Sequence, residues 1–472
     1  MGKGKIVGAV SYAALEGAFI EGLAGAGNSP GASVWALVPT NLLALHLRRV
    51  TARRMGGVAG VEFLTLKDAA RRMALPSLAL RGGRPLPAGA VELVLQRLLE
   101  GVADDSYFAA FRRFSNGAAA IGRAVRQLED CTWTPEALRA AADAAGQRDP
   151  AAPRRLRQLA DIWEGLRAWK ERNALFEDDD LVAEAAGAEL RPAEHPEDLF
   201  IYGFYDFNPS QRLLVGRLIC LAARCSAYLL WASPPASGFE FALPTVQWLG
   251  NQLGADGVEC VHGPPTGSDL ERLIADVFQE HPLLREDKAR QRLQDAGGGF
   301  DGSVRVLSCP GELSEAAEVA REVLRVAGAV GAPQSIGVLL RGTEGAAGPL
   351  AEAFERTGVR CYVREGLPLA ETVAGRVALS MLELAVGGAE RTAVVDFLAL
   401  ADVAWPAGLS ASALDRVARQ AGIIKGRADW ERRLHARAEQ LRREGERTDD
   451  EAEGRICARD AALCTAGVGF LR

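Results

Sequence analysis

The sequence predicts an α/β protein built on parallel β-sheets, with α-helical segments inserted between the strands. Short apolar runs typical of buried strands alternate with segments of helical periodicity, first within residues 1–85 and again within residues 301–385. Strands that alternate with helices favour a parallel sheet. Hydrophobic residues make up 48% of the 472 residues, which is ample for several cores. About three or four domains are expected at this length.

Residues 1–85 contain the first part of the expected sheet. Strand-like runs are present at 6–10, 34–38 and 61–65. Helical segments at 42–55 and 67–74 follow the second and the third of these runs. Residues 86–195 then change character: they are rich in Ala, Leu and Arg at helical spacing, and Pro and Gly separate the pieces. We expect an α-helical insertion there.

The strand pattern returns in residues 196–300. Strands are expected at 199–202 and 227–231, with a helix at 212–223 between them. A charged stretch that contains Gly297, Gly298 and Gly299 closes this region and indicates a linker.

Residues 301–385 repeat the alternation and predict the start of a second α/β unit. Its strands are expected at 304–307, 336–340 and 359–363, and its helices at 312–326 and 348–357. The pattern is helical from Thr372 onward, so residues 386–472 form an expected helical region.

The segment Leu199–Gln211 is the centre of the functional argument. An apolar run ends abruptly in a turn of Tyr, Asp, Asn and Pro, and a helical pattern follows. This is typical of a buried strand whose carboxyl end opens onto a loop. In open α/β sheets, ligands bind at that edge.

Composition excludes several classes of protein. The net charge is −6 with a pI near 5.7, so a strongly basic nucleic-acid footprint is absent. Local basic clusters, such as Arg48, Arg49, Arg53 and Arg54, are interpreted as solvated helix faces. No apolar run reaches the roughly 18 residues of a membrane span. No signal peptide is recognisable at the start, so a cytoplasmic location is expected.

The metal-ligand residue types are scattered. Eight cysteines form no C-x-x-C pair, and they are expected to be buried thiols. The five histidines are mutually distant. We therefore predict no metal site and no cofactor in this chain.

Five segments then occur in the order of the motifs of a known family. They are Val38–Asn41, Phe63–Leu66, the acidic Glu177–Leu181, Phe204–Gln211 and Ile336–Arg341. In this order the chain resembles UvrD-like superfamily 1 helicases. More closely, it resembles the AddB-type B subunit of bacterial ATP-dependent helicase/nucleases, a family that also carries a PD-(D/E)XK nuclease.

The resemblance implies two RecA-like, P-loop-type domains with helical insertions. Residues 1–85 and 196–300 would form domain 1A, 86–195 a 1B-like insertion, 301–385 the start of a 2A-like domain, and 386–472 an incomplete 2B-like region. Thr40, Asn41 and Thr65 would contact single-stranded DNA. The alternative is that they cap the helices that follow. Arg341 would be a relic of the nucleotide site, a salt-bridge partner or a DNA contact.

The departures from the family pattern concern its chemistry. A P-loop needs G-x-x-x-x-G-K-[ST], but Gly8 is followed at the corresponding positions by Ala13, Ala14 and Leu15. Tyr202 and Gly203 stand where the carboxylates of Walker B belong, although Asp206 to Gln211 keep the family's turn. We therefore expect a degenerate nucleotide site at Gly8, Tyr202, Gly203, Asp206 and Gln211, and no catalytic residue.

The leading hypothesis is a non-catalytic helicase-like subunit that guides single-stranded or duplex-end DNA. It would act with a UvrD-type helicase/nuclease partner in double-strand-break end resection and recombinational repair, in the cytoplasm and associated with the nucleoid, with no membrane partner. Family members can carry Mg²⁺ and a 4Fe–4S cluster with their nuclease, and we expect this chain to stop before that module. Two alternatives stay open: a DNA exonuclease whose catalytic domain lies beyond Arg472, and an α/β scaffold with no nucleic-acid role.

Overall fold

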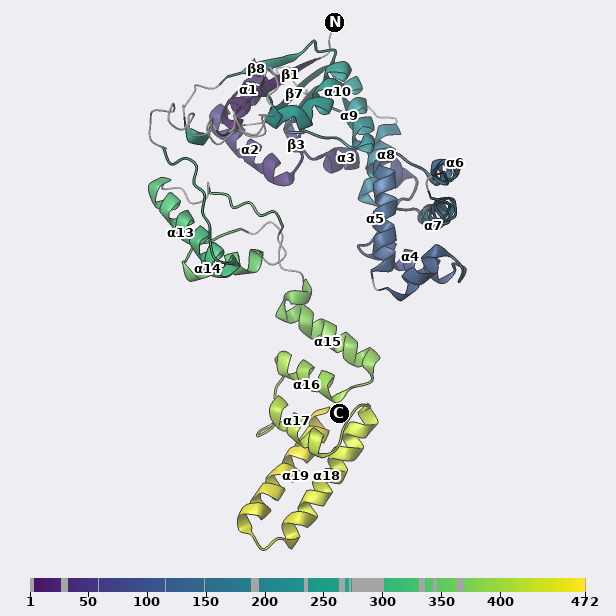
Figure 1. Cartoon of the computed structure of the whole chain (residues 1–472), viewed down its shortest axis with the longest axis vertical. Helices are drawn as coiled ribbons and strands as arrows, with labels where there is room; N and C mark the ends of the chain where they lie inside the picture. Colours follow the sequence, from purple (N-terminus) through teal and green to yellow (C-terminus); the bar gives the residue numbers. More distant parts are fainter. Residues whose placement is uncertain are drawn as a thin grey trace. The chain divides into compact units, whose positions relative to one another are not determined.

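The chain divides into two compact units, Met1–Arg305 and Val306–Arg472 (Figure 1). The computed structural model describes residues 4–26, 33–57, 59–114, 116–147, 149–187, 195–232, 237–262, 268–270, 273, 301–330, 336–342, 346–362 and 369–471. The linker expected around the three glycines at 297–299 lies outside these residues.

The first unit is organised around a six-stranded sheet in the order β3-β2-β6-β7-β1-β8. Every neighbouring pair in it is parallel, so the predicted α/β class with a parallel sheet is confirmed. The edge strand β8 was not predicted, because its four residues are only partly buried. The strands are β1 (Gly4–Ala9), β2 (Val34–Leu37), β3 (Val61–Leu64), β6 (Asp198–Tyr202), β7 (Arg224–Leu230) and β8 (Val258–Val261).

One face of the sheet is covered by α1 (Tyr12–Ala24) and α2 (Asn41–Met55). Phe19 of α1 is fully buried, and its ring meets four aromatic rings of the sheet edge-on at centroid distances of 5.0–6.4 Å. Such edge-to-face contacts stabilise a core beyond the burial of apolar area. The helix α1 was not predicted. Small residues lie between its four buried apolar positions, so the helical spacing of those positions is weak in the sequence.

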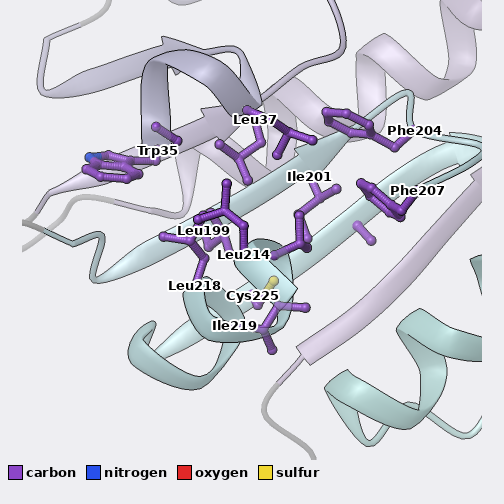
Figure 2. Packing of buried hydrophobic residues seen from close by; sticks show 14 of the residues in the cluster. Trp35, Leu37, Leu199, Ile201, Phe204, Phe207, Leu214, Leu218, Ile219 and Cys225 are labelled. Carbon is purple, nitrogen blue, oxygen red and sulfur yellow. The ribbon is translucent and has the colours of Figure 1, made fainter. Parts of the chain in front are cut away.

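The opposite face is covered by four helices, so the sheet lies between two helical layers. Figure 2 shows this core, where Leu214 and Leu218 of α9 pack against Leu199 and Ile201 of β6. Strand β6 is buried along all five residues, as expected for a central strand covered on both faces. The four helices are α3 (Leu66–Leu80), α8 (Asp178–Gly187), α9 (Pro209–Leu221) and α10 (Leu243–Leu253).

Helices occupy most of the described part of the expected insertion, and they form a core of their own (Figure 1). A short two-stranded parallel sheet joins the start and the end of this helical core. In it, Arg84 and Pro85 of β4 pair with Leu175 and Phe176 of β5. The elements between these strands are α4 (Ala90–Glu100), the 3₁₀ helix η1 (Tyr107–Arg113), α5 (Gly117–Asp130), α6 (Pro135–Ala145) and α7 (Ala152–Arg172).

The second unit is helical throughout its regular described structure, with separate cores for its first two helices and its last four. The strands expected at 304–307, 336–340 and 359–363 are not formed in the described residues. A strand needs a neighbouring strand to satisfy its backbone groups, but no described strand pairs with these segments in a sheet, and Val306 and Leu339 are more than nine-tenths exposed. The helices are α13 (Glu312–Val330), α14 (Ala347–Arg356), the 3₁₀ helix η5 (Leu369–Glu371), α15 (Val373–Gly387), α16 (Arg391–Leu400), α17 (Ala411–Gln420), α18 (Arg427–Arg447) and α19 (Glu451–Leu471). No helix in the described part of the chain combines the length and the apolar character that a membrane crossing requires.

Candidate functional site

The carboxyl edge of the six-stranded sheet is the candidate site. All six strands run in the same direction, so their carboxyl ends meet there. Strands β1 and β2 lead into helices on one face, whereas their neighbours β7 and β6 lead into helices on the other. Ligands of open α/β sheets bind where neighbouring connections diverge in this way.

Thr40, Asn41 and Thr65 lie side by side at this edge, after β2 and β3. The Thr40 hydroxyl accepts a hydrogen bond from the Leu43 N–H, 3.2 Å away, and caps α2. Thr65 caps α3 reciprocally with Asp68, which accepts from the Thr65 hydroxyl at 2.7 Å and from its N–H at 3.2 Å. Asn41 is exposed in the first turn of α2. The capping interpretation therefore holds for both threonines, and it leaves the Asn41 side chain accessible.

The turn after β6 brings the other predicted residues to the same edge. Gly203 has a φ of +74°, which favours glycine, and its N–H donates to the Tyr228 carbonyl of β7 at 2.8 Å. Asp206 is exposed. Asn208 and Gln211 cap α9 reciprocally, because the Asn208 side chain accepts from the Gln211 N–H at 2.8 Å. The segment resembling the helicase turn is thus a helix cap in this chain.

The connection after β1 does not fit a nucleotide phosphate. Only Val10 and Ser11 separate β1 from α1, and the Ser11 hydroxyl accepts a hydrogen bond from Ala14 N–H at 3.3 Å. A phosphate-binding loop needs a longer run of free backbone N–H groups. Gly8 lies inside the strand, and a Cβ there would come within 2.8 Å of Trp231 Cβ and 2.7 Å of Val258 Cγ1. Gly8 is therefore a packing residue.

The end of β6 likewise does not fit Mg²⁺. Tyr202 is 1% exposed and stacks beside Tyr228, and its hydroxyl has no hydrogen-bond partner among the described residues. Burial, and then the nearby Glu16 carboxylate, raise the pKa of Tyr202, so the hydroxyl stays neutral. The carboxylate of β6 is Asp198, at the opposite end, where it accepts from Arg224 at 2.7 Å.

The described residues also contain no cluster of His, Cys, Asp or Glu that could hold a metal ion. Six cysteines are exposed or partly exposed, and only Cys225 and Cys464 are buried, so the expectation of buried thiols holds for those two. Burial raises the pKa of Cys225 to about 12, which keeps it a thiol.

Exposed aromatic side chains at this edge were missed in the sequence. Tyr12 at the start of α1 and Phe241 in the 3₁₀ helix η3 (Ser237–Ala242) are both more than half exposed. The half-buried Tyr205 lies between them: its ring centroid is 5.7 Å from that of Phe241, and the Tyr12 hydroxyl, after burial, raises its pKa. Tyr12 could have been found from its position directly after the apolar strand β1, whereas Phe241 follows no strand directly.

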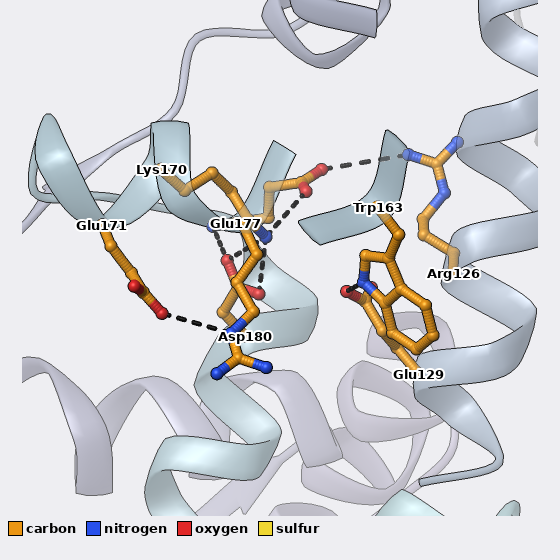
Figure 3. Close-up of polar contacts among 8 residues, drawn as sticks. Arg126, Glu129, Trp163, Lys170, Glu171, Glu177 and Asp180 are labelled. Atoms are coloured by element: carbon orange, nitrogen blue, oxygen red, sulfur yellow. Dashed lines mark hydrogen bonds and ion pairs between the residues drawn. The ribbon is translucent and has the colours of Figure 1, made fainter. Parts of the chain in front are cut away.

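The acidic segment Glu177–Leu181 lies at the start of α8, beside the first two turns of α3. Asp179 pairs with Lys67 at 3.1 Å and Asp178 with Arg71 at 2.7 Å, both on α3. Asp180 binds the buried Lys170 of α7 at 2.8 Å (Figure 3). The segment therefore joins the helical insertion to the sheet, and its charges are neutralised there.

Arg341 belongs to the second unit, where it is exposed in a described stretch without regular structure. Trp163, Trp231 and Trp430 are buried in cores, so their rings are not available to stack on bases. No protein-family model matches this sequence, and no curated protein matches it. What the carboxyl edge binds has to be inferred from its own side chains.

Proposed function

We propose that this chain is a non-catalytic, helicase-like subunit that binds and guides single-stranded DNA along the carboxyl edge of its sheet. The observation that carries the proposal is the character of that edge: in the described residues it offers helix N-termini and exposed aromatic rings, but no phosphate loop and no carboxylate cluster that could hold a metal. Binding without hydrolysis is the chemistry that such an edge supports.

The helix N-termini suit the DNA backbone. Helices α1, α2, α3 and α9 all begin at this edge, so the positive ends of their dipoles face the same side. Phosphate oxygens bind well to backbone N–H groups at helix N-termini. Asn41 adds an exposed amide beside the α2 terminus.

The aromatic rings suit the bases. Tyr12 and Phe241 project from elements that follow β1 and β7, the neighbouring strands whose connections diverge. Stacking on aromatic side chains contributes about 1–3 kcal/mol per base and tolerates any sequence. This favours sequence-independent binding of an unpaired strand over readout of a duplex.

The wider assignment rests on the resemblance of the motifs. In it, the six-stranded sheet belongs to a first RecA-like domain, a second RecA-like domain begins near residue 301, and the chain is an AddB-type subunit. A UvrD-type partner would supply the motor, the process would be end resection in double-strand-break repair, and the location would be the cytoplasm. The connection after β1 has only two residues, too few for a phosphate-binding loop. It therefore supports the proposal that this subunit does not hydrolyse nucleotides itself.

Fluorescence anisotropy with a labelled single-stranded oligonucleotide, titrated at several salt concentrations, tests the proposal. We expect affinity that falls as salt rises. Tyr12→Ala with Phe241→Ala should weaken binding at least about tenfold. Phe114→Ala is the matched control, because Phe114 and Phe241 are both 64% exposed and Phe114 lies on the insertion. Absence of salt-dependent binding would favour the scaffold alternative.

A nucleotide assay separates the subunit from a motor. We expect no phosphate release from ATP and Mg²⁺, with or without single-stranded DNA, because Tyr202 and Gly203 supply no carboxylate. The non-catalytic assignment would be wrong if phosphate-releasing activity copurified with the chain and persisted in a Tyr202→Phe variant.

A further inference from the structure

We propose that the solvent face of α2 binds the phosphates of the same DNA strand and carries it away from the carboxyl edge. We call this surface the α2 arginine face and define it by Arg48, Arg49, Arg53 and Arg54. The inference rests on the proposed function and extends it, because it adds a second surface with a different chemistry.

The helix is strongly cationic in an acidic chain. It contains four arginines and neither Asp nor Glu, while the chain as a whole has a net charge of −6. All four arginines are exposed, and none forms an ion pair in the described part of the chain. Several arginines of other helices in this unit are paired, such as Arg71 with Asp178 at 2.7 Å and Arg139 with Asp161 at 2.8 Å.

Two of the carboxylates of the neighbouring elements are paired with residues other than these arginines, one of them with His46 of α2 itself. Glu16 of α1 accepts from His46 at 2.7 Å, and Glu62 of β3 binds Arg72. The other glutamate of α1, Glu21, is exposed and forms no ion pair in the described residues. Arg49 and Arg53 are four positions apart, a spacing at which like charges destabilise a helix. The helix therefore retains a repulsion that an external anion would relieve.

The geometry suits a chain of phosphates. Arg49 and Arg53 project from successive turns, about 6 Å apart along the helix axis. Arg48 lies over the ring of Phe63 on the edge strand, 6.0 Å from its centroid, which holds the guanidinium in place. The planar guanidinium can donate two parallel hydrogen bonds to a phosphate, and α2 carries arginine without any lysine.

The surface begins where the proposed DNA path lies. Helix α2 starts at Asn41 on the carboxyl edge and runs back along the face of the sheet. A strand that contacts Asn41 can therefore continue over the arginines without crossing another element of the sheet. Ala44 and Leu47 of α2 are buried against the sheet, whereas Leu42 and Leu45 are exposed, so anionic vesicles are tested as a second ligand.

The experiment compares two double variants of the whole chain with equal charge changes. Arg49→Gln with Arg53→Gln removes two charges from the α2 arginine face and keeps good helix formers. Arg97→Gln with Arg123→Gln removes two exposed arginines, unpaired among the described residues, from α4 and α5. For single-stranded DNA, the slope of log affinity against log salt should fall by about 1.4 in the first variant and stay unchanged in the second. Circular dichroism checks that both fold.

The outcomes separate this inference from the proposed function. If the wild-type chain binds single-stranded DNA and both double variants behave alike, the α2 arginine face is not a DNA surface although the function stands. If the wild-type chain binds no single-stranded DNA, the function fails and the inference fails with it. If the α2 variant loses binding to phosphatidylserine vesicles but keeps its DNA affinity, the surface binds membranes and the inference is wrong.

Discussion

The Lys170 ammonium lies 2.8 Å from both carboxylate oxygens of Asp180 and joins the last turn of α7 to the first turn of α8 (Figure 3). Lys170 is 6% exposed, and it also contacts Glu177 at 3.3 Å. Burial lowers the pKa of Lys170, but the attraction and hydrogen bond of Asp180, together with the charges of Glu129 and Glu177, outweigh burial and the pKa is raised. The buried ammonium therefore stays charged and fixes the helical insertion against the sheet domain.

Replacing Lys170 with Met should destabilise the first unit by roughly 3–5 kcal/mol, because it leaves the Asp180 charge partly buried without its partner. Urea denaturation followed by circular dichroism measures this loss. Lys67→Met is the matched control: it breaks an exposed pair with Asp179 on the same acidic segment, and it should cost less than about 1 kcal/mol. Equal losses in the two variants would contradict the structural role of Lys170.

Replacing Thr65 with Ala should cost about 1 kcal/mol, because the Asp68 N–H of α3 loses its capping oxygen. Thr65→Ser keeps that oxygen and should recover most of the loss in the same denaturation experiment. The pair also tests the DNA contact. Equal DNA affinity in both variants would show that Thr65 only caps, whereas a loss restored by Ser would show that the hydroxyl also reaches the strand.

Replacing Gly8 with Ala should destabilise the sheet by about 1–3 kcal/mol, because the added methyl meets Trp231 and Val258 at under 3 Å. Gly25→Ala is the control, since its Cβ meets nothing closer than 3.6 Å and its φ is −85°. That change should be neutral or stabilising. If the Gly8→Ala variant is as stable as the Gly25→Ala variant, the side chains of Trp231 and Val258 move away from the added methyl without cost, and the prediction is wrong.

The second unit should lose stability in acid through Asp460. Two hydrogen bonds from Arg416, at 2.6 and 2.8 Å, lower the pKa of this buried carboxyl. Its contribution is fully present above the unfolded pKa of about 3.9 and is lost as the pH falls through the lower folded pKa. The protection factors of the amides in α17 and α19, corrected for the intrinsic exchange rate at each pH, should therefore fall below about pH 4.

In the Asp460→Asn variant, the amides of α17 and α19 should be less protected from hydrogen exchange at neutral pH. Their protection should also depend less on pH in acid, because the titrating carboxyl group is gone. Asp449→Asn, at an exposed position, should retain the wild-type profile. An acid dependence in Asp460→Asn as steep as in the wild type would assign the effect to other carboxyls.

Much of the first unit could be predicted from sequence because its signals are local. The strands at 34–37, 61–64 and 198–202 follow from apolar runs that end at polar turns, and Thr40 and Thr65 cap the helices after them. The strands predicted for a second sheet were wrong in the described residues, because an apolar run such as Ile336–Leu340 becomes a strand only if a neighbouring strand satisfies its backbone groups. Helix α1 was missed because its small residues give little periodic contrast.

The sequence by itself determined that Leu199–Gln211 is a strand followed by a capped helix, and that no lysine or carboxylate stands where nucleotide chemistry would need one. These are properties of residues within a few positions of one another. Only the tertiary structure decided that Thr40, Thr65 and Tyr202 share one edge and that the acidic segment is neutralised by Lys67, Arg71 and Lys170. It also decided that the arginines of α2 form no ion pair with any other described residue. Each of these depends on contacts between residues far apart in the chain, which strand order and helix packing alone bring together.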